Sequence, residues 1–475
     1  MKSADLENTL RKPKVDLSER ISLVLRLSLP AILAELTSIA MQYIDTLMVG
    51  KLGSEAMASI GLVSSTTWLI GGVCIGVASG FSVQTAQLIG AGRQKEAANV
   101  LRQSLVTLLA FGIILALFAA GISESLPRWL GGEQAIRKNA SLYFLVFAIS
   151  IPLIQIRQIS GSMLSCSGNV KVPSIFNSLV CVLDVIFNMF FIFPSRDITL
   201  FGRSVHIYGM GLGVLGAAIG TALADGLVAL MMLYYVCFCS DKLRLRKGGS
   251  WKLDKTILKN ALKISVPMSF DHIFMCSAYV AGTYLIAPLG SVAVAANSLA
   301  ITAESLCYMP GYGIGTAATT LVGQSIGAGK KKFATDFAYI ATALGMLIMG
   351  GMAIVMYIYA PFVFNMLTTD PAAAELGIKV IRLELIAEPL YAASIVCAGA
   401  FRGSGDTLLP SIMNLLSMWG VRITLAAILV PVYGLSGYWI AMCIELCFRG
   451  TIYLIRLFRK KWLDKSPLKS TLLNT

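Results

Sequence analysis

The sequence predicts an all-α polytopic membrane protein with twelve transmembrane helices in two parallel six-helix repeats. Three observations lead to this prediction: the composition, the recurrence of long apolar runs, and an internal repeat that divides the chain. Of the 475 residues, 56% are hydrophobic and 13% are charged, and the mean hydropathy is +0.75. A soluble domain is nearer half apolar and a quarter charged, so most of this chain is expected to lie in lipid.

Runs of about 20 apolar residues recur along the whole chain, and each is long enough to cross a bilayer as a helix. The twelve runs cover residues 26–49, 57–89, 104–122, 142–163, 173–193, 212–238, 264–287, 293–326, 337–361, 378–400, 409–430 and 437–457. The first 25 residues are polar and hold no apolar core of the signal-peptide type, so we expect no cleaved leader.

The two halves of the chain repeat one another. A single ungapped shift, the one that carries Pro30 onto Pro267, aligns Gly and Pro positions from Pro30 as far as Asn177. The aligned segments are 52–54 with 289–291, 87–92 with 324–329, 168–174 with 405–411, and Asn177 with Asn414. Later the shift becomes shorter and carries Gly213 onto Gly434, which assigns the extra residues of the first half to the 194–211 loop.

Because each half holds an even number of spans, both halves enter the membrane in the same sense, as in transporters with parallel repeats. We therefore expect a substrate path at the interface between the halves. The predicted divisions are a cytoplasmic tail at 1–25, an N-lobe at 26–239, a basic linker at 240–263, a C-lobe at 264–457, and a second cytoplasmic tail at 458–475.

The placement of positive charge predicts the orientation in the membrane. Most of the 39 Lys and Arg residues fall in the two tails and the even-numbered loops, and three, Arg157, Arg422 and Arg449, lie well inside spans. This asymmetry is the positive-inside signature, and it predicts that both termini are cytoplasmic. We expect the protein in the cytoplasmic (inner) membrane. The net charge of +14 is thus explained by topology and by attraction to anionic lipid, without nucleic acid as a partner.

Several chemistries have no motif in this sequence. The ten cysteines are scattered without a C-x-x-C pair, which favours buried apolar residues over a disulfide framework or a zinc site. The sequence contains neither a phosphate-binding G-x-x-x-x-G-K-[ST] loop nor a G-x-S-x-G nucleophile motif. We therefore expect a protein that is not an enzyme and that needs no cofactor.

Polar side chains inside spans of the N-lobe form one candidate site. Asp45 lies near the outer end of the first helix, and Asp184 and Asn188 share one face of the fifth because they are four residues apart. Thr221 on the sixth helix lies at a similar depth. Hard cations take oxygen ligands of these kinds, and two nearby carboxylates can also hold one proton. The alternatives are a helix-end Asp45 that reaches water and a structural hydrogen bond between Asp184 and Asn188.

The C-lobe does not repeat this set, because Gly282 and Val421 stand where the N-lobe has Asp45 and Asp184. It carries its own acids within spans: Asp271 beside His272, Glu304, Glu384, and Glu388 directly before Pro389. Of these, Glu388, Asp271 and Glu304 are the possible functional acids of the second lobe, with Glu388 at an expected helix break.

Several of these segments together resemble the multidrug and toxic compound extrusion (MATE) family. They are Pro30, Asp45-Thr-Leu-Met-Val-Gly50, Gly-Ala-Gly92, Gly168-Asn-Val-Lys-Val-Pro173 and Phe401-Arg-Gly-Ser-Gly-Asp-Thr407, and the resemblance spans about residues 20–457. It implies two six-helix bundles in a V and antiport of organic cations against sodium ions or protons. It also implies a coupling site of Asp45, Asp184, Asn188 and Thr221, with sodium as the only metal expected there.

The function expected from the sequence is secondary-active multidrug efflux of cationic amphipathic compounds by a protein that acts as a monomer. The alternative from the same broad superfamily is a flippase for lipid-linked oligosaccharides, which would favour more basic residues inside the spans. A channel would need a symmetric ring of polar groups, and the acids of the two halves differ. A membrane enzyme would need clustered His, Ser or metal ligands. The sequence leaves the substrate and the choice between sodium and protons open.

The predicted orientation can be tested with reporter fusions. A reporter inserted within 240–260 should report the cytoplasm, and one within 195–208 should report the opposite side, because Lys and Arg are retained inside. Swapped results would reverse the side assigned to every loop.

Overall fold

The structure is a computed structural model of the chain, and it describes residues 16–200, 203–245, 251–368 and 370–466. Nearly all of these residues are helical, and the helices follow the order of the predicted apolar runs. The all-α fold class predicted from the sequence is therefore confirmed.

The N-lobe consists of seven α-helices, a terminal π-helix and one hairpin. They are α2 (Leu17–Gly50), α3 (Ser54–Gly90), α4 (Gln94–Ile122), α5 (Leu126–Trp129), α6 (Gln134–Cys166), α7 (Lys171–Phe191), β1 (Pro194–Leu200), β2 (Arg203–Met210), α8 (Gly213–Tyr234) and the π-helix η1 (Tyr235–Cys239). β1 and β2 pair antiparallel, with an irregularity between Pro194 and Arg196. The hairpin accounts for the extra residues of the first half, which the sequence comparison assigned to the 194–211 loop.

The C-lobe follows the same order without a hairpin. Its elements are α9 (Lys255–Ile286), the 3-10 turn η2 (Ala287–Leu289), α10 (Ser291–Gly327), α11 (Lys331–Leu367), α12 (Pro371–Glu384), α13 (Glu388–Ser404), α14 (Leu408–Ser417), the π-helix η3 (Met418–Ile423), α15 (Thr424–Tyr433), α16 (Leu435–Arg459) and the 3-10 turn η4 (Lys461–Asp464).

Ten helical runs in the described part of the chain are long and apolar enough to cross a membrane. The other two predicted spans are helical as well, but each falls short of the length or the hydropathy of those ten for a local reason. The span 378–400 is divided into α12 and α13, because Pro389 has no N–H to continue the first helix. The span 437–457 lies in α16, where Glu445 and Arg449 lower the hydropathy. All twelve predicted spans are thus present as helical passages.

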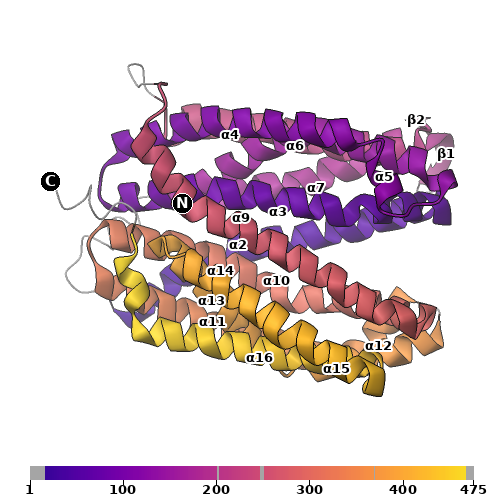
Figure 1. Cartoon of the computed structure of the whole chain (residues 1–475). Helices are drawn as coiled ribbons and strands as arrows, with labels where there is room; N and C mark the ends of the chain where they lie inside the picture. Colours follow the sequence, from indigo (N-terminus) through magenta and orange to yellow (C-terminus); the bar gives the residue numbers. More distant parts are fainter. Residues whose placement is uncertain (1–15, 201–202, 246–250, 369, 467–475) are drawn as a thin grey trace.

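The two lobes form separate bundles that meet in a V. Figure 1 shows the N-lobe helices in indigo to magenta above the C-lobe helices in orange to yellow, with α9 running obliquely between the bundles. The bundles approach each other toward the end of the molecule where the termini lie and diverge toward the end with the β1–β2 hairpin. The lobes also exchange contacts, because α3 packs on α9 and α2 packs on α10.

The three arginines singled out inside spans each have a carboxylate partner. Arg157 on α6 pairs with Asp225 on α8, Nε to Oδ1, at 3.0 Å. In the C-lobe, the fully buried Glu445 accepts a hydrogen bond from Arg422 at 2.6 Å and forms an ion pair with Arg449, whose Nε lies 3.0 Å from Glu445 Oε1. The Ser417 hydroxyl also donates to Glu445, at 2.6 Å. These contacts join α14, η3 and α16 across the interior of the lobe, where water cannot replace them.

Replacement of Glu445 by Gln should destabilise the C-lobe. The substitution keeps the size of the side chain but leaves two buried guanidiniums without their carboxylate, which costs about 3–5 kcal/mol in comparable buried pairs. The midpoint of thermal unfolding of the purified protein in detergent should fall accordingly. Glu375→Gln on the exposed face of α12 is the control and should leave the midpoint unchanged. Equal midpoints for the two variants would show that the cluster contributes no net stability.

Candidate cation site

The four polar residues singled out in the N-lobe lie together in the structure. Asp45 is on α2, Asp184 and Asn188 are on α7, and Thr221 is on α8. α7 packs against both α2 and α8, so it brings the other two helices to one point. Because α2 ends at Gly50, the cluster lies toward the end of the molecule away from the termini.

The amide of Asn188 joins the two carboxylates. Its Nδ2 donates to Asp45 Oδ1 at 3.0 Å and to Asp184 Oδ2 at 2.9 Å. Thr221 follows Gly220, whose backbone lies against the side chain of Asn188. Asp184 and Asn188 are buried, whereas Asp45 and Thr221 are half-buried. The cluster therefore has two members, Asp45 and Thr221, past which a small ion could enter.

Two oxygens of the cluster have no hydrogen-bond partner. They are Asp184 Oδ1 and Asn188 Oδ1, and both atoms are buried. Buried oxygens without donors are costly unless a proton or a cation binds them. Together with the carboxylate of Asp45 and the Thr221 hydroxyl they form an oxygen-only donor set, of the kind that suits a proton or a hard cation.

A glycine that the sequence analysis did not assign to the site controls its packing. A Cβ on Gly220 of α8 would lie 2.2 Å from Asn188 Oδ1, and one on Gly216 would lie 2.3 Å from the Phe191 carbonyl oxygen. Small residues four apart let two membrane helices approach closely. The run Gly216-Ala-Ala-Ile-Gly220 thus carried a signal that could have identified this contact.

The C-lobe has no copy of this cluster, as the repeat predicts. Gly282 lies at the position equivalent to Asp45, and a Cβ there would be 2.4 Å from the hydroxyl oxygen of Tyr438. Under the shorter shift that carries Gly213 onto Gly434, the N-lobe residue equivalent to Tyr438 is Ala217. Tyr438 therefore fills the space that the N-lobe leaves for its carboxylate.

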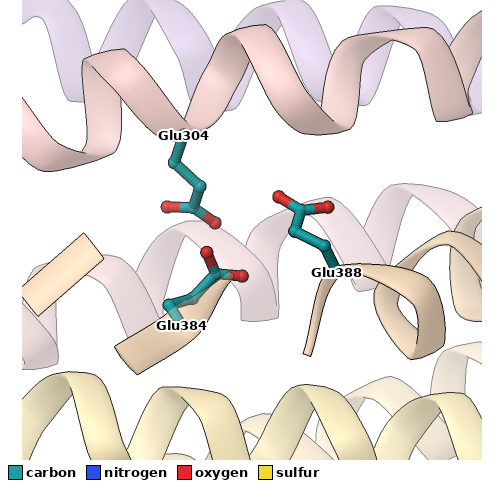
Figure 2. Close-up of side chains that lie close together, drawn as sticks. All are labelled: Glu304, Glu384 and Glu388. Carbon is teal, nitrogen blue, oxygen red and sulfur yellow. The ribbon is translucent and has the colours of Figure 1, made fainter. Parts of the chain in front are cut away.

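The C-lobe instead brings three glutamates together, as Figure 2 shows. One carboxylate oxygen from each of Glu304, Glu384 and Glu388 lies within 4.8 Å of the others. Glu304 projects from α10, while Glu384 ends α12 and Glu388 begins α13, on either side of the break before Pro389. Glu384 and Glu388 are fully buried, and none of their four carboxylate oxygens has a hydrogen-bond partner.

The structure separates Asp271 from this group. Asn414 donates from Nδ2 to both carboxylate oxygens of Asp271, at 3.1 Å each. Asn414 in turn accepts from the Tyr453 hydroxyl at 2.8 Å. Asp271 therefore lies outside the group of glutamates, and a functional role for it stays a prediction. The third member of the group is Glu384, and its spacing of four residues from Glu388 was the available signal.

Twelve helical passages in two parallel repeats, with buried carboxylates in each lobe, define a polytopic membrane transport protein. The chain belongs to the MatE family, whose model matches residues 30–190 and again residues 267–428. The two matches begin at Pro30 and Pro267, so they reproduce the shift between the halves found in the sequence.

Bacterial relatives and solved structures resemble the chain over nearly its whole length. It is 26% identical over 461 residues to the probable multidrug resistance protein NorM of Thermotoga maritima, covering 96% of each chain. It is 23% identical to the multidrug resistance protein MdtK of Yersinia pseudotuberculosis, over 94% of this chain and 96% of that one. A MATE crystal structure in complex with MaL6 has a TM-score of 0.87 at 21% identity and covers 98% of this chain and 100% of its own. An outward-facing multidrug resistance MATE transporter has a TM-score of 0.86 at 22% identity, with 98% and 99% covered.

Replacement of Gly220 by Ala should disturb the cluster through packing alone. The added methyl group would collide with the amide oxygen of Asn188, and overpacking of this kind costs about 1–3 kcal/mol. The midpoint of thermal unfolding in detergent should therefore fall. Gly71→Ala on α3 is the matched control, because a Cβ there has nothing within 4 Å. An unchanged midpoint for Gly220→Ala would mean that α8 can move away without cost.

Proposed function

We propose that the protein is a secondary-active multidrug efflux transporter that exports cationic amphipathic compounds in exchange for inward sodium ions or protons. The observation that carries this proposal is the N-lobe cluster, in which Asn188 joins Asp45 to the buried Asp184. The names of the NorM and MdtK relatives support the multidrug part of the proposal. The protein would act in the cytoplasmic membrane with both termini inside.

The geometry supplies a way to couple the two movements. A carboxylate inside the bilayer binds a proton or a cation rather than stay bare, because its desolvation is otherwise uncompensated. Asp45 can receive the ion from the open end of the V, while Asp184, Asn188 and Thr221 supply further oxygens. Coupling then requires only that the ion and the drug favour different arrangements of the two lobes.

The three glutamates of the C-lobe form a second candidate ion site within the same proposal. Within the described residues, the two guanidiniums buried in this lobe, Arg422 and Arg449, are both bound to Glu445. Glu304, Glu384 and Glu388 have no such ion pair, so their charge must be reduced by protons or by a bound cation. We rank this site second because all the oxygens of Glu384 and Glu388 are closed off from solvent.

The flippase alternative gains no support from the three arginines singled out inside spans. A flippase for an anionic lipid-linked sugar would present unpaired cations to the path between the lobes. In this chain Arg157, Arg422 and Arg449 are each bound to a carboxylate.

Asp45→Asn should abolish gradient-driven export and leave the protein folded. Asn keeps the size and polarity of the side chain but cannot be charged, so ion binding no longer changes the balance between the two arrangements of the lobes. Export of a fluorescent organic cation from vesicles under an imposed sodium or proton gradient is the measurement. Glu55→Gln, at the exposed start of α3, is the control and should retain transport.

Two further variants locate the coupling site. Asp184→Asn combined with Asn188→Ala should also abolish export, whereas Val421→Ala, at the equivalent C-lobe position, should be tolerated. If Glu388→Gln abolishes export while Asp45→Asn does not, the C-lobe glutamates couple transport and the assignment to the N-lobe is wrong.

A further inference from the structure

The two lobes meet through a reciprocal contact between α3 and α10 at the end of the molecule that holds the termini. A Cβ on Gly90 of α3 would lie 2.0 Å from the carbonyl oxygen of Gln324. A Cβ on Gly327 of α10 would lie 1.8 Å from the carbonyl oxygen of Gln87. The shift that carries Pro30 onto Pro267 also carries Gly90 onto Gly327 and Gln87 onto Gln324. Each contact is therefore the copy of the other under the internal repeat.

The axis that relates the repeats passes through this contact. A Cβ on Gly323 would lie 2.9 Å from the Cβ of Ala86, and these two residues are also equivalent under the same shift. Equivalent residues can touch each other only on the symmetry axis. The end of α3 and the end of α10 thus cross at the one line about which the lobes are related.

Two glutamine side chains make matching hydrogen bonds across the axis. Gln87 donates from Nε2 to the Gly403 carbonyl oxygen of the C-lobe at 3.0 Å. Gln324 donates from Nε2 to the Cys166 carbonyl oxygen of the N-lobe at 2.7 Å. The two acceptors are again equivalent under the repeat, and both glutamines are buried. Gly403 and Cys166 lie in the last turns of α13 and α6, where backbone carbonyls have no partner within their own helix.

The segment after α16 adds a third contact on one side of the axis. The Ser466 hydroxyl donates to Gln87 Oε1 at 2.8 Å. This segment is anchored just before Ser466, because Trp462 is fully buried with its ring centroid 5.7 Å from that of Phe401, and Asp464 pairs with Lys331 at 2.7 Å. Gln87 is therefore held at both ends of its amide, between the C-lobe and the C-terminal segment.

We propose that Gln87 and Gln324 are the paired latch that keeps the lobes closed at the terminal end, and that Ser466 holds the Gln87 half of it. For the V to open at this end instead, the hydrogen bonds donated by both glutamine amides must break and the ends of α3 and α10 must separate. Neutral hydrogen bonds suit this role, because they are weaker than charge-assisted ones and water can replace them when the ends part. The latch rests on the proposed function in one respect: the two lobes must rock relative to each other. Its test requires no measurement of transport.

A native cysteine reports the state of the latch. Cys166 is a free thiol that is 4% exposed, and its own carbonyl accepts the bond from Gln324. Separation of the lobes at this end would uncover it. The measurement is the rate at which N-ethylmaleimide alkylates Cys166 in the purified full-length protein, followed by mass spectrometry of its peptide.

Gln87→Ala and Gln324→Ala should each raise this rate about fivefold, the shift in equilibrium expected from one neutral hydrogen bond. The double variant should raise it by about the product of the two, and Ser466→Ala by less than either. Gln155→Ala is the matched control: Gln155 is buried and donates to the Cys74 carbonyl oxygen at 3.3 Å, but within the N-lobe. It should leave the rate at Cys166 unchanged.

A second pair of variants keeps the test decisive if a glutamine variant does not fold. Gly90→Ala should raise the alkylation rate by pushing the helices apart, whereas Gly71→Ala on the same helix should not. The latch is refuted if the double glutamine variant labels at the wild-type rate, or if Gln155→Ala accelerates labelling equally. Failure of the antiport proposal would appear instead as drug export by Asp45→Asn, with the labelling results unaffected.

Discussion

Inside the bilayer no water is available to solvate a charged group, and this constraint determines the interior of both lobes. Arg157, Arg422 and Arg449 each have a carboxylate partner, so they serve the architecture. The carboxylates of Asp45 and Asp184 share a single amide donor, and Glu384 and Glu388 of the C-lobe have none. These groups have electrostatic requirements that the protein does not meet by itself, and this incomplete pairing is what distinguishes candidate ion sites from structural ion pairs.

The internal repeat gives the two lobes the same backbone arrangement, but their buried polar side chains differ. Where the lobes touch on the axis, the equivalent residues Gln87 and Gln324 are kept in both halves, since each must meet the same surface. Inside the lobes the halves differ, because Asp184 corresponds to Val421, and Glu304, Glu384 and Glu388 correspond to Thr67, Phe147 and Ile151. The two halves are thus alike at their contact on the axis and different at their buried acids.

The sequence predicted the spans, the repeat and the meeting of Asp45, Asp184, Asn188 and Thr221, because helical periodicity and span depth determine those positions. It did not identify the role of Gly220, which depends on how closely two helices approach. It also did not separate Asp271 from the glutamates, because Asn414 comes from another helix and pairs with Asp271 only in three dimensions. The break between α12 and α13 was expected at Pro389, but its consequence, which turns Glu384 and Glu388 toward Glu304, required the fold.

The tyrosine at position 438 restricts what the C-lobe can hold at position 282. Because Tyr438 occupies the space beside Gly282, an acid at that position would need a second, compensating change on α16. A single substitution therefore cannot give the C-lobe the first-helix acid of the N-lobe, and the two halves are not interchangeable templates for each other.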